Sequence, residues 1–231
     1  MSARRALIPI ALTLLAVGCS DERQPIGVPP TPTPHVLRWA GNMPPQFSVP
    51  DGGVVQSASR GLMASLTDGL SLDNNVVTFW AVRGEARSVQ INYLSSSGDT
   101  SFPFLHLTIT DPVYMPGLGD IMPGDSVQIT VTVDPTDIKV TLEPTGLQFG
   151  EPAQLQIWYG GAGGDMNGDG VVDEADGQIE TSLLGLWYRE GADSAWAKIP
   201  ASQSIGDKSF ISALRHFCEY EVSYFEYATS W

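Results

Sequence analysis

Apolar and polar residues alternate along many short segments of this 231-residue chain, from about Val76 onward. The clearest example is 127–133, where four apolar residues alternate with Gln128, Thr130 and Thr132. The same pattern occurs at 89–93, 105–109 and 138–142, and further strands are expected at 154–159, 183–189, 195–199, 209–215 and 217–225. Period-two alternation is typical of strands with one buried face, and Gly- and Pro-containing turns separate these segments. The pattern predicts an all-β fold, an antiparallel sandwich or barrel, and of these we expect an Ig-like β-sandwich.

The sandwich is expected to occupy residues 76–227, which is long enough for one buried core. Residues 37–75 form an N-terminal extension with a less regular pattern, which either adds one or two edge strands or lies over the sandwich. A helix is expected only after Asp173, continuing to about Glu180.

One acidic stretch interrupts the strand pattern, in an insert at about 163–181. It runs Asp165-Met166-Asn167-Gly168-Asp169-Gly170-Val171-Val172-Asp173-Glu174-Ala175-Asp176. Oxygen-bearing side chains fall at loop positions 1, 3, 5, 9 and 12, and the sharp turn after position 5 has a glycine that can adopt positive φ. This spacing predicts a Ca²⁺ site with side-chain ligands from Asp165, Asn167, Asp169, Asp173 and Asp176 and a backbone carbonyl from Val171. The alternative is an acidic, solvated loop that binds nothing.

The stretch matches the EF-hand pattern except that position 12 is Asp instead of Glu. In this respect it resembles the calcium loop of dockerins. Dockerins that bind cohesins carry two such repeats, and this chain has one. The resemblance therefore implies a calcium loop–helix inserted in another domain, and no cohesin partner is expected.

The first residues have the features of an export signal. Arg4 and Arg5 precede an apolar stretch that ends in Leu15-Ala16-Val17-Gly18-Cys19, which resembles a bacterial lipobox. Residues 1–18 are expected to be a lipoprotein signal peptide, and Cys19 the lipidated residue that anchors the chain to a membrane. The alternative is an ordinary secretory signal. Residues 19–36 form a Pro-rich tether, and Ser20 after the anchor points to the outer membrane of a bacterial cell envelope.

Charge and cysteine content narrow the possible partners. The formal charge of the chain is −14, and loss of Arg4 and Arg5 with the signal peptide makes it −16. So acidic a surface argues against nucleic acid as a partner, because nucleic acid requires clustered Lys and Arg. The chain has two cysteines, so lipidation of Cys19 leaves Cys218 without a partner within the chain, and a disulfide framework is excluded.

The predicted sandwich resembles a known domain. Its Val140-Thr141-Leu142-Glu143-Pro144-Thr145-Gly146-Leu147-Gln148-Phe149 segment, the Leu186-Trp187-Tyr188 segment and the His216-Phe217-Cys218-Glu219-Tyr220 segment are similar to the ZU-five domain. This β-sandwich is named for zonula occludens proteins and Unc-five netrin receptors. The resemblance covers about residues 76–227 and implies a structural or interaction role, such as adhesion or scaffolding. The inserted calcium loop and Cys218, where Ser is usual, depart from the family pattern.

Some members of that family cleave their own backbone before this Ser. The resemblance makes Phe217–Cys218 the corresponding bond, with Cys218 as the nucleophile of an N-to-S acyl shift and His216 handling the proton. The opposing interpretation is that Cys218 is a small core residue, on one strand face with His216, Tyr220, Val222 and Tyr224. Self-cleavage is therefore an alternative to the main prediction, which is a non-enzymatic protein.

Other enzyme classes have little support in the sequence. The chain has three histidines, His35, His106 and His216, which lack zinc-site spacing, and it has no nucleophile elbow, Walker loop or dinucleotide fingerprint. The six Trp and seven Tyr residues could form a carbohydrate-stacking face. Trp158, Trp187 and Trp196, however, fall in predicted strands, where core positions are expected. The sequence thus predicts a calcium-binding envelope lipoprotein with an unidentified protein or glycan partner.

Overall fold

The computed structural model describes residues 34–41, 44–50, 52, 54–55, 70–94 and 100–225. The predicted signal peptide, Cys19 and most of the predicted tether lie outside these residues. The described residues all belong to one compact unit. No helix in the described part of the chain is long and apolar enough to cross a membrane.

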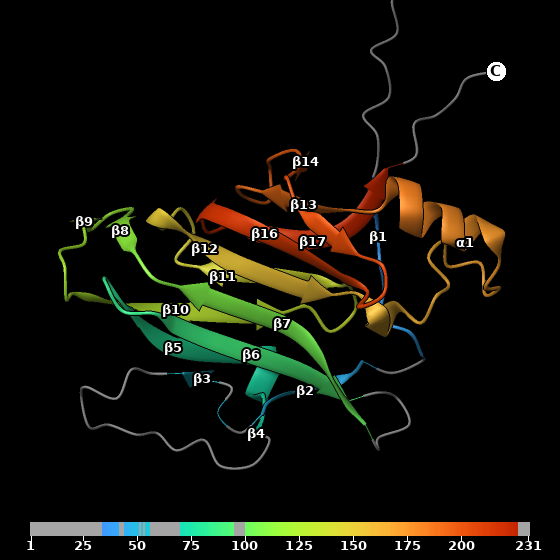
Figure 1. The fold of residues 1–231 in the computed structure, drawn as a ribbon, viewed down its shortest axis with the longest axis horizontal. Helices are drawn as coiled ribbons and strands as arrows, with labels where there is room; N and C mark the ends of the chain where they lie inside the picture. Colours follow the sequence, from blue (N-terminus) through green and yellow to red (C-terminus); the bar gives the residue numbers. More distant parts are fainter. Residues whose placement is uncertain are drawn as a thin grey trace, which may run out of the picture. The chain divides into compact units, whose positions relative to one another are not determined.

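Two antiparallel sheets form the body of the domain (Figure 1). In the first, the described strands follow the order β14 (Ala197–Lys198), β13 (Gly185–Arg189), β17 (Glu219–Phe225), β11 (Lys139–Glu143), β10 (Ser126–Val133) and β5 (Val76–Val82), with β1 (Pro34–Val36) beside β17. In the second, the order is β15 (Ser202–Ser204), β16 (Ser209–His216), β12 (Gln148–Trp158), β7 (Ser101–Ile109), β6 (Arg87–Leu94), β2 (Gln46–Val49) and β4 (Leu70–Ser71). Short strands β3 (Val54–Val55), β8 (Pro112–Met115) and β9 (Gly119–Asp120) extend this sheet. The predicted all-β sandwich is confirmed.

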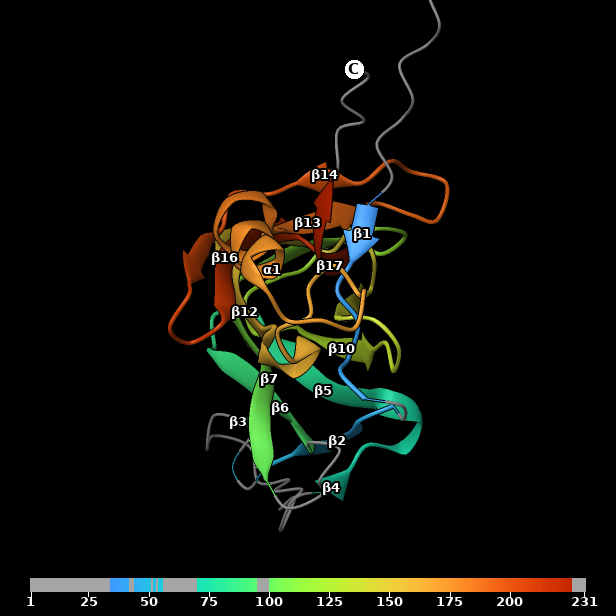
Figure 2. The same cartoon turned by 90° about the vertical axis from the view of Figure 1, so that its right-hand side faces the viewer.

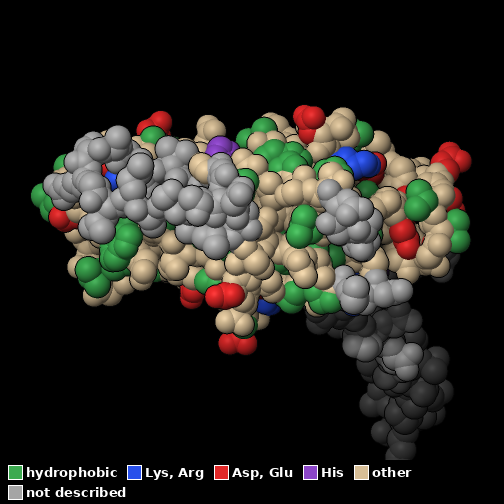
Figure 3. All heavy atoms as spheres, turned by 90° about the horizontal axis from the view of Figure 1, so that it is seen from below, with side chains coloured by type: hydrophobic (Ala, Val, Ile, Leu, Met, Phe, Trp, Pro, Cys, Tyr) green, Lys and Arg blue, Asp and Glu red, His purple; other side chains and the backbone are tan. Residues whose placement is uncertain are grey.

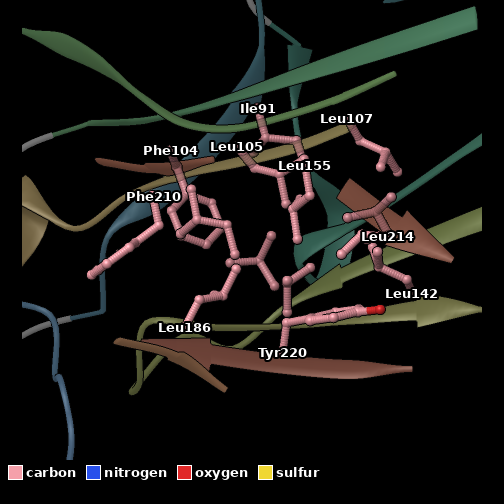
Figure 4. Packing of buried hydrophobic residues seen from close by; sticks show 14 of the residues in the cluster. Ile91, Phe104, Leu105, Leu107, Leu142, Leu155, Leu186, Phe210, Leu214 and Tyr220 are labelled. Carbon is pink, nitrogen blue, oxygen red and sulfur yellow. The ribbon is translucent and has the colours of Figure 1, made fainter. Parts of the chain in front are cut away.

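The alternating pattern places side chains as expected. On β10 the apolar residues Val127, Ile129, Val131 and Val133 are buried, and the polar residues between them are exposed or half-buried. Figure 4 shows Ile91, Leu107 and Leu155 of the second sheet facing Leu142, Leu186 and Tyr220 of the first. The core therefore lies between the sheets, where burial of apolar surface is the main stabilising contribution.

The N-terminal extension belongs to the sandwich. β2 pairs with β6, and β4 pairs with β2. Leu37 and Phe47 are each 1% exposed and join the core, so the buried core begins well before residue 76. β1 also forms a strand from residues that the sequence assigned to the tether. The sequence gives only a weak indication of these N-terminal strands, because each is too short to establish an alternating pattern.

The predicted strands at 209–215 and 217–225 exist with slightly different ends, but they lie in different sheets. β16 ends at His216 in the second sheet, and β17 begins at Glu219 in the first. Phe217 and Cys218 connect these two strands and carry the chain from the second sheet to the first. His216 therefore does not share a strand face with Cys218. Tyr220, Val222 and Tyr224 are buried as expected, but Glu221 and Ser223 between them are buried as well, so burial does not alternate along β17.

Candidate functional site

The acidic insert connects β12 of the second sheet to β13 of the first. It starts with the 3-10 turn Gly160–Ala162 and ends in the helix α1 (Glu174–Gln178), which continues as a π-helical turn at Ile179–Leu183. Four apolar residues hold the insert to the core: Ala162, Met166, Ile179 and Leu184. Figure 1 places α1 at the same end of the domain as β1, away from β8 and β9, and Figure 2 looks toward that end.

The first half of the loop winds around its own polar side chains. The Asp165 carboxylate accepts the backbone N–H of Gly168 and of Gly170, each at 2.8 Å. Both glycines have positive φ, 75° and 88°. Gly170 at position 6 therefore supplies the left-handed turn that the spacing predicted, where a side chain would be strained.

The next two loop positions continue this arrangement. Asn167 Oδ1 accepts the N–H of Asp169 at 2.9 Å, and Asp169 Oδ1 accepts the N–H of Val171 at 2.8 Å. The Asn167 amide also donates to Asp169 Oδ2 at 2.9 Å. Predicted ligand side chains at positions 1, 3 and 5 are thus oriented by short hydrogen bonds within the loop.

Asp176 closes the loop. Its Oδ1 accepts the N–H of Met166 at 2.7 Å and of Asn167 at 3.2 Å, while Oδ2 accepts the N–H of Asp173 at 2.9 Å. Asp173 in turn caps α1 by accepting the N–H of Ala175 at 2.8 Å. Asp176 is only 2% exposed. These hydrogen bonds, first the one from Asp173, lower the pKa of Asp176, so the carboxylate is charged although it is buried.

The loop carboxylates have no basic partner within the described residues. On the face of the domain shown in Figure 3, acidic side chains occur at several separate places, and the side chains drawn in colour form no continuous basic patch. Within the described residues, the loop carboxylates therefore receive hydrogen bonds from backbone amides and from the Asn167 side chain, and none from a basic side chain.

The donor set can be compared with what Ca²⁺ requires. Among the described residues, no three His, Cys, Asp or Glu side chains are gathered closely enough to hold a metal ion. The loop carboxylates instead face backbone amides and would have to turn toward a common centre. The residue types still fit, because the loop combines four Asp carboxylates with the oxygen of Asn167, and a carboxylate oxygen that accepts one N–H keeps a second lone pair.

A polar cavity of about 350 Å³ separates the beginning of the loop from β1. Asp165 and Asn167 line it on one side, and His35 and Arg38 line it on the other. The Arg38 guanidinium lies 3.8 Å from Asp137, which lines the same cavity. The loop thus lies close to the segment through which the chain enters the sandwich.

The His216-Phe217-Cys218 motif is tightly held. Phe217 donates its N–H to the carbonyl of Leu147 at 2.9 Å and accepts the N–H of Gly146 at 2.8 Å. Cys218 is 1% exposed, and burial raises the pKa of its thiol to about 12. At neutral pH the thiol is therefore protonated, which opposes the role of a nucleophile. His216 Nε2 lies 3.4 Å from Glu190, and its buried Nδ1 has no hydrogen-bond partner.

Trp158, Trp187 and Trp196, which the sequence pattern places in strands, do not occupy the expected core positions. Each of the three is half-buried. The ring of Trp187 lies 3.9 Å from that of Phe225, and the Arg189 guanidinium lies 4.8 Å from the ring of Trp196. Among the tryptophans that the structure describes, the buried one is Trp39, which the sequence pattern did not single out because it lies in an irregular segment.

Comparison with protein families, curated proteins and solved structures gives no match to this chain. The fold and the site define an antiparallel β-sandwich with an acidic loop–helix insertion. The ZU-five and dockerin resemblances remain sequence-based expectations.

Proposed function

We propose that the Asp165–Asp176 loop binds one Ca²⁺ ion, which stabilises a non-enzymatic β-sandwich with a structural or interaction role in the bacterial cell envelope. The observation that carries this proposal is the closure of the loop. Asp176, the twelfth residue, is hydrogen-bonded to the amides of the second and third residues, Met166 and Asn167. A loop that is already closed on itself loses less conformational entropy when it orders around an ion.

The ligands would come from six positions of the loop. Side-chain oxygens would be supplied by Asp165, Asn167 and Asp169, a carbonyl oxygen by Val171, a direct or water-mediated contact by Asp173, and the last ligand by Asp176. This set is suited to Ca²⁺, which prefers six to eight oxygen ligands in a flexible geometry. Binding would replace some of the hydrogen bonds within the loop and would offset the repulsion among its carboxylates.

The position of the loop explains how an ion there would stabilise the whole domain. The insert follows β12, precedes β13 and borders the cavity beside β1. An ion that orders the loop would therefore fix the ends of strands from both sheets. With free calcium a hundredfold above the dissociation constant, the gain is about 2.7 kcal/mol.

The cellular role rests on the sequence features at the N-terminus. Lipidation of Cys19 would anchor the protein to the membrane, and the Pro-rich tether would hold the sandwich away from the surface of the outer membrane. The ZU-five resemblance supports adhesion or scaffolding through a protein or glycan partner. The alternative of self-cleavage at Phe217–Cys218 is disfavoured by the buried, protonated thiol of Cys218.

The proposal is tested by melting the mature domain in calcium and in EDTA. We expect calcium to raise the melting temperature by roughly 5–10 °C, which corresponds to the linkage gain for a domain of this size. The double variant Asp165→Ala/Asp169→Ala should lose this difference. A matched control, Glu151→Ala/Asp193→Ala, removes the same charge from exposed positions outside the loop and should keep it. Equal melting of the unaltered domain in both solutions would contradict the proposal.

A further inference from the structure

An open hollow of about 470 Å³ lies where the acidic insert leaves β12. Its lining combines the aromatic residues Trp39, Tyr93 and Phe102 with Gly160, Gly161 and Asp207. These residues come from five separate segments of the chain. A volume of this size is typical of small-molecule sites.

The wall of the hollow is rigid. A Cβ atom at Gly161 would lie 2.4 Å from Trp39 Cζ3 and 3.3 Å from Tyr93 Cζ, so only glycine allows both rings to approach the backbone. Ala40 donates its N–H to the carbonyl of Gly161 at 2.8 Å, and Trp39 Nε1 donates to the carbonyl of Asp134 at 3.0 Å. The ring of Tyr93 is therefore held in place by a neighbour that is itself fixed.

Two of the rings are open to a ligand. Phe102 is 42% exposed and Tyr93 is half-buried, and their ring centroids lie 5.7 Å apart with an angle of 31° between the planes. Together they form a shallow apolar shelf. The Tyr93 hydroxyl makes no hydrogen bond within the described part of the chain. The shelf therefore carries a polar group with unused hydrogen-bonding capacity at its edge.

The charged groups at the hollow favour a neutral, hydroxyl-rich ligand. Lys208 is paired with Glu180 at 2.8 Å, so its charge is already compensated. Asp207 uses Oδ2 to accept the Ser204 hydroxyl at 2.9 Å and retains Oδ1 as an acceptor. An anionic ligand would meet this carboxylate and the net charge of −14 of the chain. A sugar ring instead offers an apolar C–H face to the aromatic shelf and hydroxyl donors to the carboxylate.

We infer that this hollow binds a neutral hexose unit of a glycan, stacked on Phe102 and Tyr93 and hydrogen-bonded to Asp207. The site is distinct from Trp158, Trp187 and Trp196. It does not require calcium, although the Gly160–Ala162 turn at its base leads directly into the acidic loop. The partner in the proposed interaction role would then be a glycan.

The test uses the mature domain and immobilised neutral oligosaccharides of glucose, galactose, mannose and N-acetylglucosamine. We expect binding to at least one of them. Phe102→Ala should weaken that binding about tenfold, in line with the loss of one aromatic contact. Asp207→Asn should also weaken glycan binding. Because Asp207 lies in an exposed turn, this variant should keep the melting temperature of the unaltered domain. Trp80→Ala is the matched control, because Trp80 is 50% exposed on β5 and does not line the hollow.

Each other outcome overturns the inference. These outcomes are no binding to any of the four glycan types, or binding by Phe102→Ala or Asp207→Asn that equals binding by the unaltered domain. Repeating the measurement in EDTA separates this inference from the calcium proposal, because glycan binding should persist even where calcium has no effect on melting.

Discussion

The carboxylate of Asp176 accepts the backbone N–H of Met166 at 2.7 Å, ten residues earlier in the chain. Met166 is itself buried against the core, with 6% of its surface exposed. This one hydrogen bond therefore joins the end of the acidic loop to its beginning at a point anchored in the sandwich. Asp176 thus holds the loop closed even without a cation, in addition to supplying the last ligand of the proposed site.

Asp176→Ala and Asp169→Ala should differ in their effects on stability. Asp176→Ala leaves three backbone N–H groups without their acceptor, so we expect a lower melting temperature in calcium and in EDTA. Asp169 is exposed, and Asp169→Ala should lower the melting temperature mainly in calcium. Thermal melts of both variants in both solutions check this. If Asp176→Ala melted like the unaltered domain in EDTA, the closing role would be wrong.

Glu221 on β17 should make the domain less stable as pH rises toward neutrality. It is 1% exposed, and its Oε1 has no hydrogen-bond partner. Burial raises its pKa from 4.5 to about 7, with Glu219 acting in the same direction and Lys139 and Arg189 opposing it. Protonation of Glu221 favours the folded state, because the pKa of this side chain is higher there than in the unfolded chain. The stabilisation from this protonation is complete below pH 4.5 and is lost as pH rises to about 7.

The corresponding measurement is chemical denaturation at pH 5 and at pH 8. The loss of stability attributable to Glu221 is at most about 3 kcal/mol. Glu221→Gln should reduce the pH dependence and should be more stable than the unaltered domain at pH 8. Glu219→Gln, which alters the neighbouring ion-paired carboxylate, serves as the control and should not be stabilising. An unchanged pH profile in Glu221→Gln would contradict the assignment.

Gly161→Ala should destabilise the domain by about 1–3 kcal/mol, because the new methyl group overlaps the packed ring of Trp39. That ring cannot easily move, since it packs edge-to-face against Phe47 and Phe104. Gly177→Ala is a suitable control, because a Cβ atom there meets nothing within 4 Å and α1 would gain helix propensity. Denaturant unfolding should show opposite signs for the two variants, and equal effects would exclude close packing at Gly161.

The chain should remain uncut between Phe217 and Cys218. The buried thiol of Cys218, with its pKa of about 12, should also react with a thiol reagent only after unfolding. Intact mass measurement and a native-state thiol assay test these two expectations. Two fragments that meet at Phe217–Cys218 would support self-cleavage instead.

The sequence predicted best the features that depend on local pattern. Alternation on β10 identifies the buried face because strand side chains point alternately to opposite sides, and Gly170 marks a turn that other residues adopt only with strain. The helix after Asp173 was also expected and begins at Glu174. In each case a few neighbouring residues determine the outcome.

Features that depend on distant pairing could not be predicted in this way. Trp39 and Phe102 are more than sixty residues apart, and nothing in either segment indicates that they line one hollow. His216 and Cys218 are close in sequence, yet the chain crosses between sheets there. Local alternation cannot reveal a change of sheet, because both strands have the same period.

The most direct test of the account is to count calcium ions bound to the folded, mature domain by equilibrium dialysis followed by elemental analysis. We expect one ion per chain at millimolar calcium and none in Asp165→Ala/Asp169→Ala. A folded, unaltered domain that retains no calcium under these conditions would contradict the account.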